Sequence, residues 1–230
     1  MKKTDIKNTD DLFRSSGCFQ KLIPEEFEYI STRKKQVIYQ KGETICKQGA
    51  FAPYVLYVID GFVKVSLEMG RSKQKNISLL KSGDFIAFAS VFGESVYNYT
   101  TQALRESIIC MIDKDALKRL LYENNEFAYA IVSRNYHGEN HLLEIIKNIT
   151  HKQMPGKLSS TLLYLSSDEF AAEQVFKNLS RQDIADFAGI TVESTVKLLK
   201  EFEQNGLIEM DRKQIRIINF DALKEISLRG

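Results

Sequence analysis

The sequence predicts an α+β protein in three parts: short helices and a β-rich domain over residues 1–114, a long helix over 115–153, and a small helical domain ending in a hairpin over 154–230. Three observations support this division. Regularly spaced glycines separate short strand-like runs in the first part. Helix formers dominate the second part, which holds one glycine and no proline. Met154-Pro155-Gly156 then interrupts the helical pattern and marks the last boundary.

The β-rich domain alternates apolar residues between turn residues. The segment YVLYVIDGFVKVSLE places Val55, Tyr57 and Ile59 on one face of a strand. Asp60-Gly61 predicts a tight turn into a second strand, so we expect a β-hairpin here. Short strands at this spacing, with glycines at 42, 49, 61, 70 and 83, predict a jelly-roll-like β-roll.

The long helix carries a heptad pattern, with successive spacings of three and four residues. Its members are Ala128, Ile131, Asn135, Gly138, Leu142, Ile145 and Ile149. This seam predicts a helix that pairs with a second copy of the chain in a homodimer. The alternative is a helix packed against its own β-domain.

The segment LSRQDIADFAGITVESTVKLLKEFEQNGLIEM (179–210) predicts two helices joined by a turn. Ser180 can cap the first helix with Asp183 in the capping-box position, and Gly189 permits the turn. Thr191 can cap the second helix, and Gly206 ends it. This pattern is typical of a helix-turn-helix, whose second helix enters the DNA major groove. The strands that follow, with a basic turn at 212–213, predict the wing of a winged helix.

The candidate DNA-contacting residues are Ser180, Arg181, Thr191, Val192, Glu193, Ser194, Lys197, Lys200, Arg212 and Lys213. Glu193 could accept a hydrogen bond from cytosine N4, or it could only stabilise the first turn of its helix. Lys197 could donate to guanine O6 and N7, or it could only contact phosphate. Residues 152–230 carry 11 basic and 12 acidic side chains, so DNA binding depends on where the charges lie.

Composition excludes several classes of protein. The hydrophobic content of 43% and charged content of 27% are typical of globular proteins, and no apolar run is long enough to cross a membrane. The N-terminus lacks the apolar segment of a signal peptide, so we expect a cytoplasmic protein. Three cysteines without a CxxC spacing indicate neither a disulfide framework nor a zinc site. We see no nucleophile elbow or P-loop, and expect no enzyme activity.

Residues 10–230 resemble the Crp/Fnr family of transcription regulators. The most specific stretches are LSRQDIADFAGITVESTVKLLKEFEQNGLI, GDFIAFASVF and PGKLSSTLLYLS. The resemblance implies a homodimer that binds an inverted repeat in double-stranded DNA, with the β-roll as sensor and RNA polymerase as partner if it activates transcription. VESTVK stands where the family usually has Arg-Glu-Thr-Val-x-Arg or Val-Glu-Thr-x-Ser-Arg. Glu193 is retained and Lys197 replaces arginine, so we expect an altered target sequence.

The candidate effector pocket departs further from the family pattern. Its residues are Phe85, Phe88, Asn98, Tyr99, Leu142 and Leu143. Cyclic-AMP-binding members have Gly-Glu where Ala87-Phe88 stands and Arg-Ser or Arg-Thr where Asn98-Tyr99 stands, so we do not expect cyclic AMP to bind. An iron–sulfur cluster is not expected either, because Cys18 is the only cysteine near the N-terminus.

Three other possibilities remain open for the signal. His137 and His141 lie one helical turn apart and could bind haem or a metal. The pocket could instead be filled by its own side chains, with regulation by abundance alone. The chain could also be a receptor module that acts through a protein partner rather than DNA.

Overall fold

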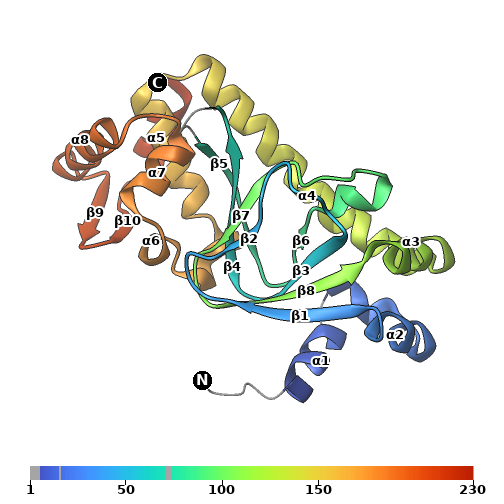
Figure 1. Ribbon diagram of the computed structural model, residues 1–230. Helices are drawn as coiled ribbons and strands as arrows, with labels where there is room; N and C mark the ends of the chain where they lie inside the picture. Colours follow the sequence, from blue (N-terminus) through green and yellow to red (C-terminus); the bar gives the residue numbers. More distant parts are fainter. Residues whose placement is uncertain (1–5, 16, 71–73, 230) are drawn as a thin grey trace. The chain divides into compact units, whose positions relative to one another are not determined.

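The computed structural model describes residues 6–15, 17–70 and 74–229, and the chain divides into two compact units (Figure 1). The first unit comprises Met1–Leu67 and Ser78–Glu139, and the second comprises Glu68–Ile77 and Asn140–Gly230. Helix α4 (Asn125–His151) belongs to both units. Within the described residues, no helix is long and apolar enough to cross a membrane.

Two four-stranded sheets form the β-rich part of the chain, as expected for a β-roll. One sheet has the order β1 (Lys34–Tyr39), β8 (Ser107–Asp113), β3 (Tyr54–Asp60) and β6 (Phe85–Ile86). The other has the order β2 (Thr44–Cys46), β7 (Thr100–Ala103), β4 (Phe62–Glu68) and β5 (Gln74–Lys81). Val58, Val63 and Ile109 pack in one apolar cluster drawn from both sheets. The predicted jelly-roll-like β-roll is therefore confirmed.

The predicted hairpin between β3 and β4 is wrong, because these two strands lie in different sheets. Gly61, with φ of +154°, carries the chain from one sheet to the other. A Cβ atom at this position would lie 2.5 Å from the Cβ of Ser107, so the crossing requires glycine. A two-residue turn signal does not reveal which strand pairs with which, because pairing is decided by burial on both faces of each strand.

Strand β3 is buried on both faces, and this explains its alternating pattern. Leu56 and Val58 face the cluster between the sheets. Val55, Tyr57 and Ile59 face the opposite way, as predicted, into a second cluster covered by helices. These helices are α1 (Ile6–Ser15), the 3₁₀ turn η1 (Gly17–Lys21), α2 (Pro24–Ser31), α3 (Lys114–Glu123) and the first turns of α4.

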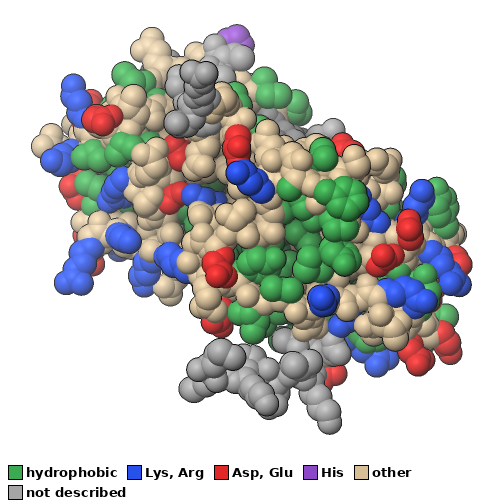
Figure 2. All heavy atoms as spheres, in the orientation of Figure 1, with side chains coloured by type: hydrophobic (Ala, Val, Ile, Leu, Met, Phe, Trp, Pro, Cys, Tyr) green, Lys and Arg blue, Asp and Glu red, His purple; other side chains and the backbone are tan. Residues whose placement is uncertain are grey.

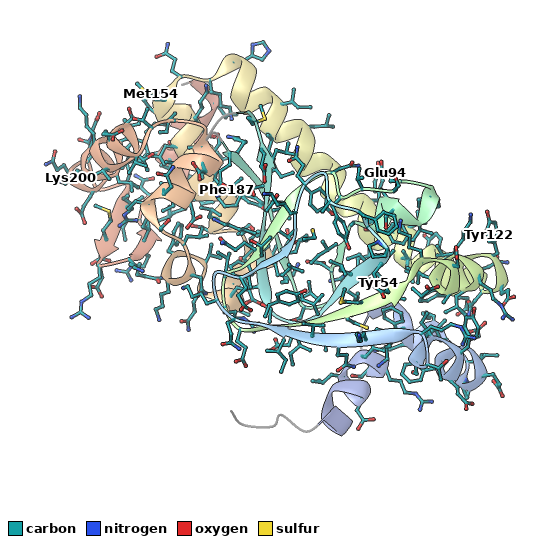
Figure 3. All side chains as sticks on the ribbon, viewed as in Figure 1. Tyr54, Glu94, Tyr122, Met154, Phe187 and Lys200 are labelled. Carbon is teal, nitrogen blue, oxygen red and sulfur yellow. The ribbon has the colours of Figure 1, made fainter. Side chains whose placement is uncertain are left out.

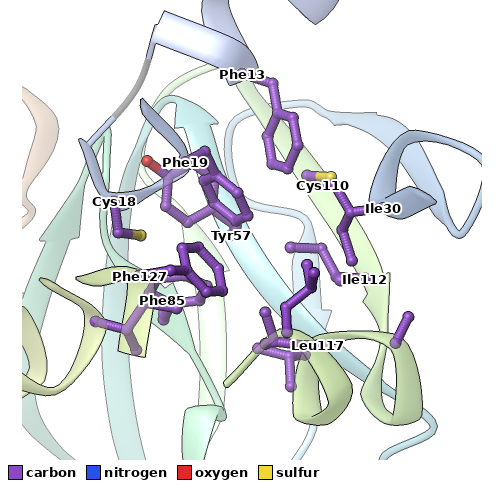
Figure 4. Packing of buried hydrophobic residues seen from close by; sticks show 14 of the residues in the cluster. Phe13, Cys18, Phe19, Ile30, Tyr57, Phe85, Cys110, Ile112, Leu117 and Phe127 are labelled. Atoms are coloured by element: carbon purple, nitrogen blue, oxygen red, sulfur yellow. The ribbon is translucent and has the colours of Figure 1, made fainter. Parts of the chain in front are cut away.

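Aromatic rings form the centre of this second cluster (Figure 4). The ring of Phe19 meets Tyr57 edge-on at a centroid distance of 5.0 Å and lies 5.5 Å from Phe127. Phe85 lies 4.8 Å from Tyr57. Aromatic pairs at such distances contribute about 0.5–1.5 kcal/mol each beyond the area that they bury. The cluster thus fixes η1 and the start of α4 on the outer face of the sheet.

The helical segment predicted over 115–153 is two helices rather than one. Asn124 has an extended backbone conformation and ends α3. Its side-chain oxygen then accepts a hydrogen bond from the amide of Phe127 at 2.9 Å, which caps α4. Asparagine is neutral to unfavourable inside helices but favourable at caps, so Asn124 was the signal that sequence reasoning overlooked.

The helical part of the second unit forms a small domain with its own core. Its helices are α5 (Met154–Leu165), η3 (Asp168–Glu173), α6 (Val175–Asn178), α7 (Arg181–Ala188), α8 (Val192–Gln204) and α9 (Phe220–Arg229). Strands β9 (Ile208–Asp211) and β10 (Gln214–Ile217) form an antiparallel hairpin. Leu158, Ile184 and Leu199 are almost wholly buried among these elements.

The crossing at Gly61 gives a direct test of the sheet arrangement. We expect Gly61→Ala to lower the free energy of unfolding by about 1–3 kcal/mol, because the new methyl group overpacks against Ser107. Gly42→Ala is the matched control: Gly42 also has a positive φ, but its Cβ would meet nothing within 4 Å. Urea titration measures both variants, and an equal loss of stability would contradict the close contact at Gly61.

Candidate nucleic-acid interface

Helix α7 begins with the predicted capping box. The Ser180 hydroxyl accepts a hydrogen bond from the amide of Asp183 at 3.1 Å, and the Asp183 carboxylate accepts one from the amide of Ser180 at 2.8 Å. The Ser180 hydroxyl also donates to this carboxylate at 2.6 Å. Asp183 is 9% exposed, so its charge is used within the cap. Ser180 therefore fixes the start of the first helix.

A tight turn connects α7 to α8. Gly189 adopts the left-handed conformation with φ of +68°, and its amide donates to the carbonyl of Ala185 at 2.8 Å. Thr191 then caps α8, with its hydroxyl accepting from the amide of Ser194 at 3.2 Å. Leu198, Leu199 and Phe202 are buried, which fixes the inner face of α8 as expected. The opposite face of α8 is consequently directed away from the core.

One acidic and two basic side chains of α8 lie on this outer face. Glu193, Lys197 and Lys200 are exposed, whereas Val192 and Ser194 are half-buried. Lys200 points away from the ribbon in Figure 3. Its position one turn after Val196, which is also exposed, extends the same accessible surface. The recognition face is thus available to a partner such as the edge of a base pair.

The β9–β10 wing adds further basic groups. Arg212 has φ of +53°, and it forms with Lys213 the two-residue turn between the paired residues Asp211 and Gln214. Both basic side chains are exposed. Figure 2 shows Lys and Arg side chains gathered at the left edge of the view, over α8 and the wing. Acidic side chains lie among them, including Glu203, which accepts a hydrogen bond from the amide of Met210 in the wing, and the domain as a whole is slightly acidic.

Arg181 connects α7 to the wing. Its guanidinium donates to the carbonyl of Arg212 at 3.3 Å and lies 3.7 Å from the sulfur of Met210. Burial lowers the pKa of Arg181, and the charge of Glu203 opposes this effect. Arg181 is therefore only partly available to DNA in this structure, and it also fixes the position of the wing turn.

Glu193 is engaged within its own helix start. Its pKa is lowered by a hydrogen bond from its own backbone amide, and the Thr191 hydroxyl contributes further. The carboxylate thus stabilises the first turn of α8, which was one of the two roles considered for it. Base contact through the remaining lone pairs stays a prediction.

The four first-unit residues expected at the effector pocket divide between two apolar clusters and the surface. Phe85 is buried in the helix-covered cluster, where Phe88 packs against it at 5.5 Å. Tyr99 packs instead against the cluster between the sheets, and Asn98 is exposed and hydrogen-bonded to Glu94. Leu143 belongs to the second unit and is exposed, while the Leu142 side chain lies outside the described residues.

Sequence reasoning missed the backbone of Ala87. This residue has φ of +58°, in the left-handed region that favours glycine, and it precedes the 3₁₀ helix η2 (Phe88–Phe92). Its amide donates to the Tyr99 hydroxyl at 2.7 Å. Burial raises the pKa of Tyr99 to about 12, so this hydroxyl stays protonated and neutral. Ala87 and Tyr99, which both differ from the family pattern, are thus hydrogen-bonded to each other.

The predicted heptad seam needs correction. Ile131 is wholly buried in its own chain, in the cluster with Phe127, and Ala128 and Ile145 are half-buried. Asn135 is exposed, but its side chain bonds to the carbonyl of Ile131 at 2.8 Å. A 3-4 spacing fits two neighbouring faces of a helix, and burial in the β-roll selected this one. The side chains of Gly138, Leu142 and Ile149, and of His137 and His141, lie outside the described residues.

The exposed apolar face of α4 lies one position further along. Tyr129, Val132 and Tyr136 are 77%, 56% and 64% exposed in the first unit. Leu143 and Ile146, in the second unit, are also exposed and follow at heptad spacing. Large apolar side chains at this spacing on one helix indicate a coiled-coil seam.

Comparison with known proteins places both parts of the chain. Residues 36–124 match the cyclic nucleotide-binding domain, and residues 156–226 match the Crp-like helix-turn-helix domain. The CRP-like cAMP-activated global transcriptional regulator of Mycobacterium tuberculosis is 21% identical over 222 residues, which cover 93% of this chain and 97% of that protein. The fumarate and nitrate reduction regulatory protein of Escherichia coli is 24% identical over 210 residues, covering 88% and 82%.

The solved structure of FixK2 from Bradyrhizobium japonicum has the same fold. It superposes with a TM-score of 0.74 at 17% identity, over 86% of this chain and 98% of that one.

The cap of α7 can be tested separately from DNA binding. We expect Ser180→Ala to lower the free energy of unfolding by about 1 kcal/mol, because it removes the hydroxyl that accepts from the Asp183 amide and donates to the Asp183 carboxylate. Ser180→Thr retains a capping hydroxyl and should lose much less. Equal stability of the alanine variant and the wild type in urea titration would show that the capping box contributes nothing in solution.

Proposed function

Because the chain belongs to the Crp/Fnr family of DNA-binding transcription regulators, we propose that it binds an inverted-repeat promoter site as a homodimer, with one α8 helix in the major groove of each half-site. The observation that carries this proposal is the outer face of α8, where Glu193, Lys197 and Lys200 are exposed on a helix capped by Thr191. The proposal assigns no catalytic reaction to the chain.

The basic groups divide into two roles by position. Lys197 lies in the second turn of α8, close enough to the helix start to reach base edges, and a single ammonium group can donate to guanine O6 or N7. Lys200 and the wing residues Arg212 and Lys213 lie further from the helix start and are assigned to phosphates. Lysine lacks the bidentate fork of arginine, so Lys197 favours a target that differs from that of arginine-bearing relatives.

Dimerisation is assigned to the exposed face of α4. Tyr129, Val132 and Tyr136 would pair with the same residues of a second copy, which is the isologous contact of a two-fold dimer. Two half-sites on DNA about one helical turn apart require two recognition helices related by the same symmetry. The basic and acidic charges of the helix-turn-helix domain nearly cancel, so binding of two such domains at once to one DNA site supplies the specific affinity that a single domain lacks.

The β-roll is proposed to respond to a signal other than cyclic AMP, or to none. The amide of Ala87 is already paired with the Tyr99 hydroxyl, and Phe88 stands where a ribose-binding glutamate would be needed. A phosphate buried here would have no cation to balance its charge at Asn98 or Tyr99. The Ala87 amide is thus paired within the chain, and these positions supply neither the ribose-binding carboxylate nor the phosphate-binding cation of the family pattern.

Two other regulatory arrangements are kept as candidates. One is a haem- or gas-responsive regulator that uses His137 and His141. The other is a receptor module that acts through a protein partner, which the exposed basic groups of α8 and the wing make the weaker candidate. If the protein activates transcription, RNA polymerase is the expected partner.

The assignment of the two lysines predicts different effects on DNA. Lys197→Ala should weaken binding to the specific site by about 1–3 kcal/mol and relax its sequence preference. Lys200→Ala should weaken specific and non-specific binding alike and lower the salt slope by about one unit. Fluorescence anisotropy at several salt concentrations measures both.

Lys224→Ala serves as the control, because Lys224 is exposed on α9 in the same domain. If all three variants weaken binding equally and only on specific DNA, the division into base and phosphate contacts is wrong. If none of them weakens it, α8 is not the recognition helix.

The corrected dimer face predicts the effect of a single charge. Val132→Arg should give a monomer in sedimentation velocity at micromolar concentration, because it places two arginines opposite each other in the seam. Tyr122→Arg is the control, since Tyr122 is 79% exposed on α3 and outside the seam. Circular dichroism should show both variants folded. A dimeric Val132→Arg protein would contradict this interface.

A further inference from the structure

The second unit includes one segment from the middle of the β-roll sequence. This hairpin tip, Glu68–Ile77, joins β4 to β5, and its described residues are 68–70 and 74–77. Three consecutive side chains of the tip bond to α7. Lys75 donates to the carbonyl of Phe187 at 2.6 Å, Asn76 donates to the carbonyl of Asp183 at 3.1 Å, and Gln74 donates to a carboxylate oxygen of Asp186 at 3.1 Å.

The Lys75 contact lies at the end of α7 that most requires a donor. The last four carbonyls of a helix have no partner within it, and Phe187 is the next-to-last residue of α7. The C-terminal end of a helix also carries partial negative charge, which favours a nearby ammonium group. Lys75 therefore acts as a C-terminal cap supplied from 112 residues away in the sequence.

The contact is closely packed. A Cβ atom on Gly189, in the turn between α7 and α8, would lie 2.8 Å from the Lys75 ammonium nitrogen. Asn76 is 1% exposed. Burial lowers the pKa of Lys75 to about 8, with repulsion from Lys157 of α5 adding to the effect and Asp186 of α7 opposing it. The amine is thus enclosed between the tip, α5 and the α7–α8 turn.

We propose that Lys75 and Asn76 are positioning residues for DNA recognition: the hairpin tip braces the C-terminal end of α7 and so sets the angle at which α8 is presented. The proposal rests on the proposed function of α8. The brace leaves Glu193, Lys197 and Lys200 exposed, so it supports the recognition face without covering it. Because β4 and β5 continue into the first unit, the tip is also a covalent route by which the β-roll acts on α7.

The test is Lys75→Ala in the full chain, with Lys35→Ala as the matched control, since Lys35 is exposed on β1. We expect Lys75→Ala to weaken binding to specific duplex DNA about 5–10-fold, as for loss of one hydrogen bond of ordinary net strength, and to change non-specific binding less than twofold. Hydrogen exchange of peptides covering residues 181–190 should become faster, while secondary structure and dimer mass stay unchanged.

Three results with a folded Lys75→Ala protein would overturn the proposal. Unchanged exchange and unchanged affinity would show that the brace is absent in solution. Higher specific affinity would show that the contact opposes DNA binding. An equal fall in specific and non-specific affinity would indicate a purely structural role. If Lys75→Ala does not fold, Gln74→Ala removes an exposed contact of the same brace and should give the same pattern, more weakly.

The exchange measurement separates this proposal from the proposed function. If the wild type binds no specific DNA, the function of α8 is refuted, whereas slower exchange at 181–190 in the wild type than in Lys75→Ala still demonstrates the brace.

The pH dependence of stability gives a second check. Because the pKa of Lys75 is lower folded than unfolded, its contribution to stability grows as pH rises from about 8 toward its ordinary value of 10.5. The stability of wild type relative to Lys75→Ala should increase over that window, and a constant difference would contradict burial of the amine.

Discussion

The geometry of the α7–α8 turn is the constraint on which the DNA-binding surface depends. Gly189 allows the left-handed turn, while Ser180 and Thr191 fix where the two helices begin. Burial of Leu199 then fixes which face of α8 points inward. Once the start and the buried face of α8 are fixed, the helical repeat determines which of its residues point outward. The brace from Lys75 acts on this same turn, so local and long-range contacts set one angle.

Burial on both faces of β3 determines how the first unit is built. Strand β3 is buried on both faces, so helices must cover the outer sheet, and the start of α4 is among them. Inside the roll, the left-handed Ala87 directs its amide to Tyr99 rather than leaving it for a ligand. The first unit thus matches the cyclic nucleotide-binding domain while carrying different residues at positions 87–88 and 98–99 from those of cyclic-AMP-binding members.

Local patterns in the sequence predicted the elements well, and long-range choices less well. The capping box at Ser180, the cap at Thr191 and the basic wing turn depend on a few neighbouring residues, and all three were predicted. The pairing of β3, by contrast, is decided by burial on both faces, which a turn signal at Gly61 does not encode. The predicted seam on α4 lies one residue before the exposed apolar face. The spacing alone does not tell these two faces apart, and only burial of Ile131 within its own chain does so. Lys75 gave no local signal, since its partner lies 112 residues away.

We expect two α8 helices of a homodimer to read two half-sites of one DNA site. In vitro selection from a randomised duplex library, with the mass of the bound protein measured on the enriched DNA, tests it most directly. We expect an inverted repeat with half-site centres about 10–10.5 base pairs apart, bound by one dimer. Enrichment of a single unpaired half-site bound by a monomer, or no enrichment at all, would contradict it.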